Sequence, residues 1–82
     1  MERIETKETL NKSFGDNLRK IRKGKEITQG DMADKAGLSL RYVQAIEAGE
    51  KTPSVHTLAK LCLALSISSE TLISPMVESI RN

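Results

Sequence analysis

The chain is short, with 82 residues and a mass of 9.1 kDa. Because a domain takes roughly 150 residues, this length excludes a second full domain. Apolar residues make up 38% of the sequence and aromatic residues 2%. This supply is thin for a β-sandwich but adequate for small helices that pack through Leu, Ile, Val and Ala, so composition favours an all-α fold.

The net charge of +2 does not by itself indicate a polyanionic partner. Most of the basic excess lies in the run from Arg19 to Lys25, which forms either the solvated face of a helix or a surface for phosphates. One cysteine cannot form an internal disulfide, and neither a stretch of about 18 apolar residues nor a signal-like segment occurs. We therefore expect a cytoplasmic protein.

The supply of reactive side chains is too small for most kinds of catalytic site. The sequence holds one histidine and one cysteine, without a Ser/His/Asp spacing. These residues cannot build a metal site or a nucleophilic triad, and no glycine-rich phosphate loop is present. We expect neither enzymatic activity nor a cofactor.

The first elements are a polar arm and an amphipathic helix. Residues 1–12 are strongly polar and predict a mobile arm or a weak extra helix. Phe14, Leu18 and Ile21 then recur at i, i+4 and i+7, which predicts a helix over residues 14–24.

Two short helices follow, joined by a tight turn. Thr28 is suited to cap a helix over residues 28–36, and Gly37 after it can take a positive φ. Ser39 is suited to cap the next helix, which ends at Gly49. Their shared inner face consists of Met32, Ala33, Ala36, Leu38, Val43 and Ile46. Such a pair needs neighbouring helices to bury this face.

Pro53 and Ser54 predict the start of a fourth helix. Its apolar stripe consists of Val55, Leu58, Leu61, Cys62 and Leu65. Ser68 or Ser69 caps a fifth helix, and Ser74 with Pro75 is expected to restart a last short segment. The expected division is an arm over 1–12, a domain over 13–73 and a C-terminal segment over 74–82.

The segment from Thr28 to Gly49 meets the steric needs of a helix-turn-helix, with small Ala33 at the helix crossing and Gly37 in the turn. Further matching motifs are Leu18-x-x-Ile21-Arg22, Ile27-Thr28-Gln29, Ile46-Glu47-x-Gly49, Pro53-Ser54-x-x-Thr57-Leu58 and Leu65-x-Ile67. On these residues the chain, from about Phe14 to Ile73, resembles the Cro/CI-type (Xre) helix-turn-helix family of phage repressors and bacterial regulators. The resemblance implies a five-helix, lambda-repressor-like domain. Such a domain places its third helix in the DNA major groove, commonly as a dimer on a palindromic operator.

Four side chains of the predicted third helix face away from its buried positions and are candidates for base contacts: Leu40, Arg41, Gln44 and Ala45. The fork of Arg41 can pair with guanine O6 and N7, and Gln44 can pair with adenine. Apolar Leu40 or Ala45 can touch a thymine methyl group.

Candidate phosphate contacts are Arg22, Thr28, Gln29, Ser39, Tyr42, Lys51 and Ser54. Helix N-termini attract anions through their free N–H groups and their dipole. The resemblance gives Gln29 a phosphate contact that also braces the recognition helix, and places Lys51 in a loop that meets the backbone. Thr28 is either a cap alone or a cap that also contacts phosphate, and Tyr42 either donates to a phosphate or packs.

The resemblance also pairs Arg22 with Glu47, which links the first helix to the end of the third. The alternative is two independent surface charges. Towards the C-terminus, five apolar residues exceed what the core needs and are expected to form a dimer interface: Leu72, Ile73, Met76, Val77 and Ile80. Two copies then set their recognition helices about 34 Å apart, one turn of B-DNA. The alternative is a tail that folds back onto its own core.

The sequence therefore predicts a sequence-specific regulator of transcription. Its expected partners are double-stranded DNA and a second copy of the chain, without a membrane. Controller proteins of restriction-modification systems, stand-alone phage-type repressors and antitoxins fit equally well. The rival is an antitoxin-like or adaptor module that holds a protein partner through the C-terminal apolar residues. The net charge of +2 argues against a non-specific nucleoid binder, because such binding depends on many phosphate contacts.

Overall fold

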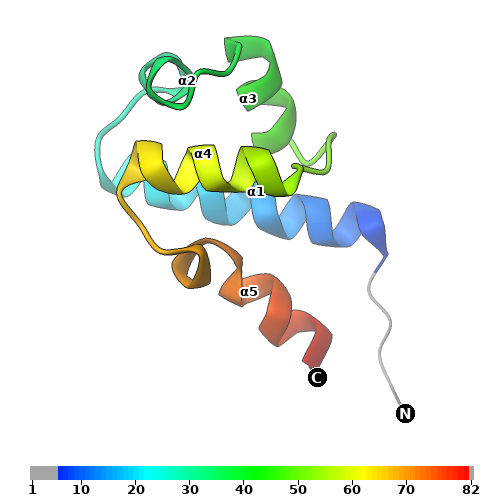
Figure 1. Cartoon of the computed structure of the whole chain (residues 1–82). Helices are drawn as coiled ribbons and strands as arrows, with labels where there is room; N and C mark the ends of the chain where they lie inside the picture. The colour runs from blue at the N-terminus through cyan, green and yellow to red at the C-terminus, as the bar shows by residue number, and fades with distance from the viewer. Residues whose placement is uncertain (1–5, 82) are drawn as a thin grey trace.

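The structure, a computed structural model, describes residues 6–81. This part of the chain forms the helices α1 (Lys7–Gly24), α2 (Gln29–Ala36), α3 (Leu40–Glu47), α4 (Val55–Leu65) and α5 (Ser69–Arg81) and contains no strand. In Figure 1, α2 and α3 lie on one side of α1 and α4, and α5 lies on the other. Helix α1 packs against α3 and α5, and α2 packs against α3 and α4. The predicted all-α, five-helix fold is confirmed.

Hydroxyl side chains begin the first four helices. Thr6, Thr28, Ser39 and Ser54 each accept a hydrogen bond of 3.0–3.1 Å from the backbone N–H three residues further on. Gly37 ends α2 with a φ of 68°, which a side chain would strain. These signals are local, which is why the bounds of α2, α3 and α4 agree closely with the prediction.

Helix α1 begins at Lys7, earlier than expected, so residues 7–12 form neither an arm nor a separate extra helix but continue α1 towards the N-terminus. Asn11 is buried and accepts a hydrogen bond of 3.1 Å from the Thr52 hydroxyl, and the stem of Lys12 lies against Gly49. These contacts with the loop after α3 stabilise the polar first turns. Residues 1–5 of the predicted arm lie outside the described residues.

Helix α5 continues through Pro75, so the expected restart at Ser74 and Pro75 is wrong. Ser68, and not Ser69, caps the helix by accepting the Thr71 N–H at 3.1 Å. Because proline lacks an N–H, a helix through this position needs another donor for the carbonyl four residues before it. Asn17 of α1 supplies that donor.

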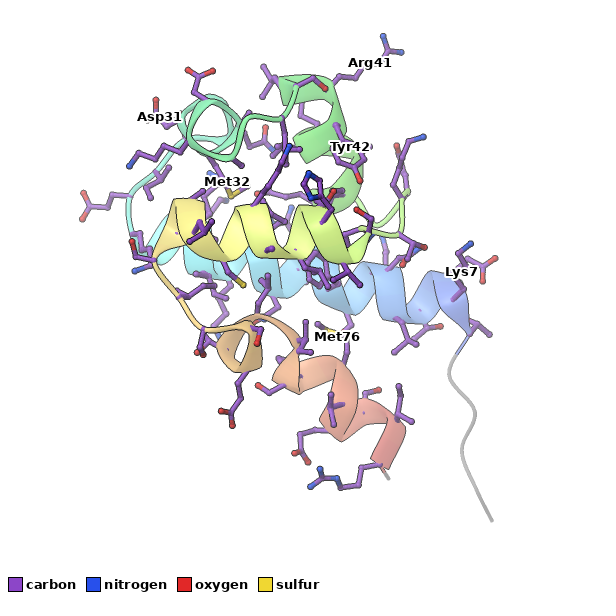
Figure 2. All side chains as sticks on the ribbon, in the orientation of Figure 1. Lys7, Asp31, Met32, Arg41, Tyr42 and Met76 are labelled. Atoms are coloured by element: carbon purple, nitrogen blue, oxygen red, sulfur yellow. The ribbon has the colours of Figure 1, made fainter. Side chains whose placement is uncertain are left out.

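The core lies between the helices and consists of Phe14, Leu18, Met32, Ala33, Ala36, Val43, Ile46, Leu61, Leu65, Leu72 and Met76. Figure 2 shows Met32 of α2 extending inward. Cys62 is half-buried beside this core, and its burial raises the pKa of its thiol. Cys62 thus packs against the core, in keeping with its place in the predicted apolar stripe of α4.

Val55 was expected in the apolar stripe of α4, but its side chain is 81% exposed. The buried face of the helix runs instead through Thr57, Leu61 and Leu65 at i, i+4 and i+8. Val55 precedes Thr57 by two residues and therefore lies on the opposite side of the helix.

Candidate nucleic-acid interface

The outer face of α3 carries the four side chains predicted to contact bases. Leu40, Arg41 and Gln44 are exposed and Ala45 is half-exposed, whereas Val43 on the inner face is fully buried. Figure 2 shows Arg41 extending away from the rest of the molecule. The structure thus brings these four residues to one accessible surface.

A shallow hollow of about 680 Å³ runs along this face and the turn after it. Its lining consists of Ser39, Arg41, Tyr42, Gln44, Ala45, Ala48, Glu50 and Lys51. Three candidate base contacts and three candidate phosphate contacts therefore share one concave surface.

A buried ion pair holds the end of α3 on the side opposite its exposed face. Arg22 Nε donates to Glu47 Oε2 at 2.6 Å and Nη2 donates to Glu47 Oε1 at 3.0 Å, while Nη1 donates to the Ile27 carbonyl at 2.8 Å. Only 7% of Arg22 and 4% of Glu47 is exposed. The two residues therefore form the interior pair and are not independent surface charges. The expectation that Arg22 contacts phosphate is wrong, because its nitrogens donate to groups inside the protein and its side chain is buried.

Gln29 extends this pair to α2. Its Nε2 donates to Glu47 Oε1 at 2.9 Å, so Glu47 joins α1, α2 and α3. A carboxylate that accepts charge-assisted hydrogen bonds from a planar guanidinium is held in one orientation. Of the two roles predicted for Gln29, the contact that braces α3 is present in the structure as this hydrogen bond to Glu47.

Gly15 of α1 allows the closest approach of α1 to α3. A methyl group at Gly15 would lie 2.5 Å from the Ile46 carbonyl oxygen and 2.6 Å from that of Glu47. Both atoms belong to the backbone of α3, so they cannot move aside without moving the helix. Sequence analysis missed this residue, although a glycine inside an amphipathic helix costs about 1 kcal/mol and is itself a sign of close packing.

A chain of hydroxyl groups links α3 to α4. Tyr42 Oη and Thr57 Oγ1 share a hydrogen bond of 3.2 Å, and Ser54 Oγ donates to Thr57 Oγ1 at 3.1 Å. Tyr42 is half-buried and Thr57 is buried. Of the two roles left open for Tyr42, the structure thus shows packing against α4. Thr57 was named in the sequence only as part of a motif, and nothing local marks it as the partner of Tyr42.

The remaining phosphate candidates lie at the surface. Thr28, Ser39 and Ser54 are exposed N-cap residues, each already accepting one backbone N–H. Lys51 is exposed in the loop after α3, next to the exposed Glu50. Lys51 and Ser39 line the hollow, whereas Thr28 lies outside its lining.

The five apolar residues predicted to form a dimer interface fall into two groups. Leu72 is fully buried and Met76 is 9% exposed, because both pack into the core. Their assignment to an interface is wrong, and for these two the alternative of folding back onto the core holds. Ile73 is half-buried, while Val77 and Ile80 are 42% and 50% exposed.

Residues 18–72 of this chain match the Helix-turn-helix family. The chain belongs to the helix-turn-helix family. It is 33% identical over 70 residues to the uncharacterized HTH-type transcriptional regulator y4dJ of Sinorhizobium fredii, covering 85% of this chain and 91% of that protein. It is also 36% identical over 61 residues to the immunity repressor protein of Bacillus phage phi105, covering 74% of this chain and 42% of the repressor.

Among solved structures, the restriction-modification controller protein C.AhdI of Aeromonas hydrophila is similar, with a TM-score of 0.74 and 34% identity. The similarity covers 76% of this chain and 94% of that structure. The resemblance to phage repressors and controller proteins is therefore confirmed. Membership of this family makes the chain a DNA-binding regulator and not an enzyme.

None of the helices between residues 6 and 81 combines the length and apolar character needed to cross a membrane. The same residues contain no group of three or more His, Cys, Asp or Glu side chains placed to hold a metal ion.

Proposed function

We propose that this regulator binds a palindromic operator as a homodimer, with α3 of each copy in the major groove. The observation that carries the proposal is the contrast between the two faces of α3. Its inner side is fixed by the buried Arg22–Glu47 pair, and its outer side presents Arg41 and Gln44 to solvent. A helix held rigidly by its scaffold, with polar side chains outward, is the arrangement that base readout requires.

Base specificity is assigned to the outer face of α3. Arg41 reads guanine through a bidentate contact and Gln44 reads adenine, while Leu40 and Ala45 contact thymine methyl groups. A good bidentate pair discriminates against the wrong base by about 1–3 kcal/mol. Arg41 is exposed and extends away from the rest of the molecule (Figure 2), so its guanidinium is available to DNA.

Phosphate binding is assigned to the residues around α3. Lys51 supplies a point charge in the loop, and the N-termini of the helices capped by Thr28, Ser39 and Ser54 attract the backbone. The amide group of Gln29 has a second N–H besides the one donated to Glu47, and this N–H serves a phosphate.

Dimerisation is assigned to the exposed part of α5. Ile73, Val77 and Ile80 recur at i, i+4 and i+7 and form one apolar stripe at the surface. Burying this stripe against a second copy removes apolar area from water and pairs two recognition helices about one turn of B-DNA apart. A regulator of this kind acts in the cytoplasm, as a repressor whose occupancy depends on its own concentration.

The test compares two basic residues that are assigned different roles. DNA bound by the wild-type protein is selected from random oligonucleotides, and affinity for variants of the selected half-site is then measured at several salt concentrations. Arg41→Ala should lose preference at one or two base positions, by about 1–3 kcal/mol each. Lys51→Ala should weaken all sequences about equally and reduce the salt slope by about one. Uniform weakening by Arg41→Ala, or no selected sequence with the wild type, would contradict the proposal.

The second candidate is an antitoxin-like or adaptor module, which the exposed apolar stripe of α5 also favours. In that case the stripe holds a different protein instead of a second copy. Purification from the native host distinguishes a DNA-binding regulator from a protein-interaction module. A stoichiometric partner protein, together with no protected DNA near the gene that encodes this chain, supports the module.

A further inference from the structure

Proline lies in the middle of α5, at position 75 of a helix that runs from Ser69 to Arg81. A proline inside a helix has no N–H to donate to the carbonyl four residues earlier, and its ring crowds that carbonyl. The carbonyl affected here is that of Thr71. Such a site bends a helix, and Figure 1 shows the ribbon of α5 changing direction along its length.

Asn17 of α1 fills the gap that Pro75 leaves. Its Nδ2 donates to the Leu72 carbonyl at 2.8 Å and to the Thr71 carbonyl at 3.3 Å. Both partners are acceptors only, so the amide must present its nitrogen, and its oxygen faces elsewhere. The bend is therefore fixed to α1 by a specific contact between residues more than 50 positions apart in sequence.

The same helix α1 holds the recognition helix. Gly15 is in close contact with the backbone at the end of α3, and Arg22 binds Glu47. Asn17 lies between these two contacts along α1. The bend in α5 and the position of α3 are thus both set by one short stretch of α1.

The bend also divides the exposed apolar stripe, with Ile73 before Pro75 and Val77 and Ile80 after it. We propose that Asn17 and Pro75 act together as positioning residues that set the direction of the second half of α5, and through it the half-site spacing that the dimer accepts. This inference depends on the proposed dimer. A straight α5 would keep Ile73, Val77 and Ile80 in line along one face, whereas the bend sets Val77 and Ile80 at an angle to Ile73, so a straight helix would pair two copies at a different angle.

The experiment measures spacing preference directly. A library carries two copies of the selected half-site separated by every spacer from zero to twelve base pairs, and bound molecules are counted. The proteins are the wild type, Asn17→Ala, Pro75→Ala and the double variant. Binding to a single half-site and the melting temperature are measured alongside, because a purely structural role would change only the melting temperature.

The wild type should enrich one spacer class. Pro75→Ala restores an N–H for the Thr71 carbonyl and straightens the helix, so the enriched spacer should shift by at least one base pair or the preference should broaden at least threefold. Asn17→Ala should broaden the preference and lower the melting temperature. In the Pro75→Ala background, Asn17→Ala should lower the melting temperature less, because the Thr71 carbonyl then has a backbone donor. Single half-site binding should stay within twofold of wild type throughout.

The outcomes separate this inference from the proposed function. No enrichment of paired half-sites by the wild type contradicts the dimer, and the inference with it. A wild-type preference that Pro75→Ala and Asn17→Ala both leave unchanged contradicts this inference alone. Equal melting-temperature losses from Asn17→Ala in both backgrounds contradict the link between Asn17 and Pro75.

Discussion

Helix α3 and the second half of α5 both present side chains to solvent, but the protein holds them in different ways. The backbone of α3 touches Gly15, and its last residue, Glu47, binds Arg22 and Gln29. Beyond Pro75, α5 packs into the core through Met76 and leaves Val77 and Ile80 exposed. The exposed face of α3 is thus mostly polar and belongs to a helix that buried contacts fix on its inner side, whereas the exposed face of α5 is apolar and lies on the other side of α1 and α4.

The largest expected effect comes from removing the acceptor at the centre of the α3 scaffold. Glu47→Ala leaves the guanidinium of Arg22 buried without a counter-charge, which should lower the free energy of unfolding by about 3–5 kcal/mol. Denaturant unfolding followed by circular dichroism measures the loss. The matched control is Glu50→Ala, an exposed carboxylate in the following loop that should change stability by less than about 0.5 kcal/mol. Similar losses for both variants would contradict a buried network that holds α3.

The second prediction separates the two groups of apolar residues in α5. Leu72→Ala opens a cavity in the core and should cost about 2–5 kcal/mol of monomer stability. Ile80→Ala removes a half-exposed side chain and should cost less than about 0.5 kcal/mol while weakening self-association. Thermal unfolding and analytical ultracentrifugation measure the two effects. If Ile80→Ala destabilises the monomer as strongly as Leu72→Ala, α5 has no free association surface.

The third prediction concerns the space between α1 and α3. Gly15→Ala places a methyl group against two backbone oxygens, so it should destabilise the protein by about 1–3 kcal/mol and shift α3. Gly24→Ala is the matched control, because nothing lies within 4 Å of a methyl group at that position. DNA affinity and unfolding free energy are compared for the two variants. Unchanged stability and DNA affinity in Gly15→Ala would contradict the close packing of α1 against the backbone of α3.

Local signals predicted much of the fold. The capping residues Thr28, Ser39 and Ser54 and the left-handed Gly37 each act within a few residues of their own position, so sequence alone located α2, α3 and α4. The outer face of α3 was predicted for the same reason, because helical periodicity separates it from Val43 and its buried neighbours.

What the sequence did not predict depends on partners that are distant along the chain. The early start of α1 has a local cap at Thr6 but also a contact between Asn11 and Thr52, and the passage of α5 through Pro75 rests on Asn17. Arg22 could have faced phosphate by its position, but Ile27 and Glu47 bind its nitrogens inside the protein. In each case a polar side chain meets a group that only the folded chain brings near.

The proposed function requires α3 to enter the duplex with its outer face. Titrating isotope-labelled protein with its selected operator and following backbone amide chemical shifts tests this requirement. The largest changes should fall on residues 39–45 and on Lys51, with residues of the buried core of α4 changing least. Shifts that are largest on α4 or α5, with the amides of residues 40–45 unmoved at saturation, would contradict it.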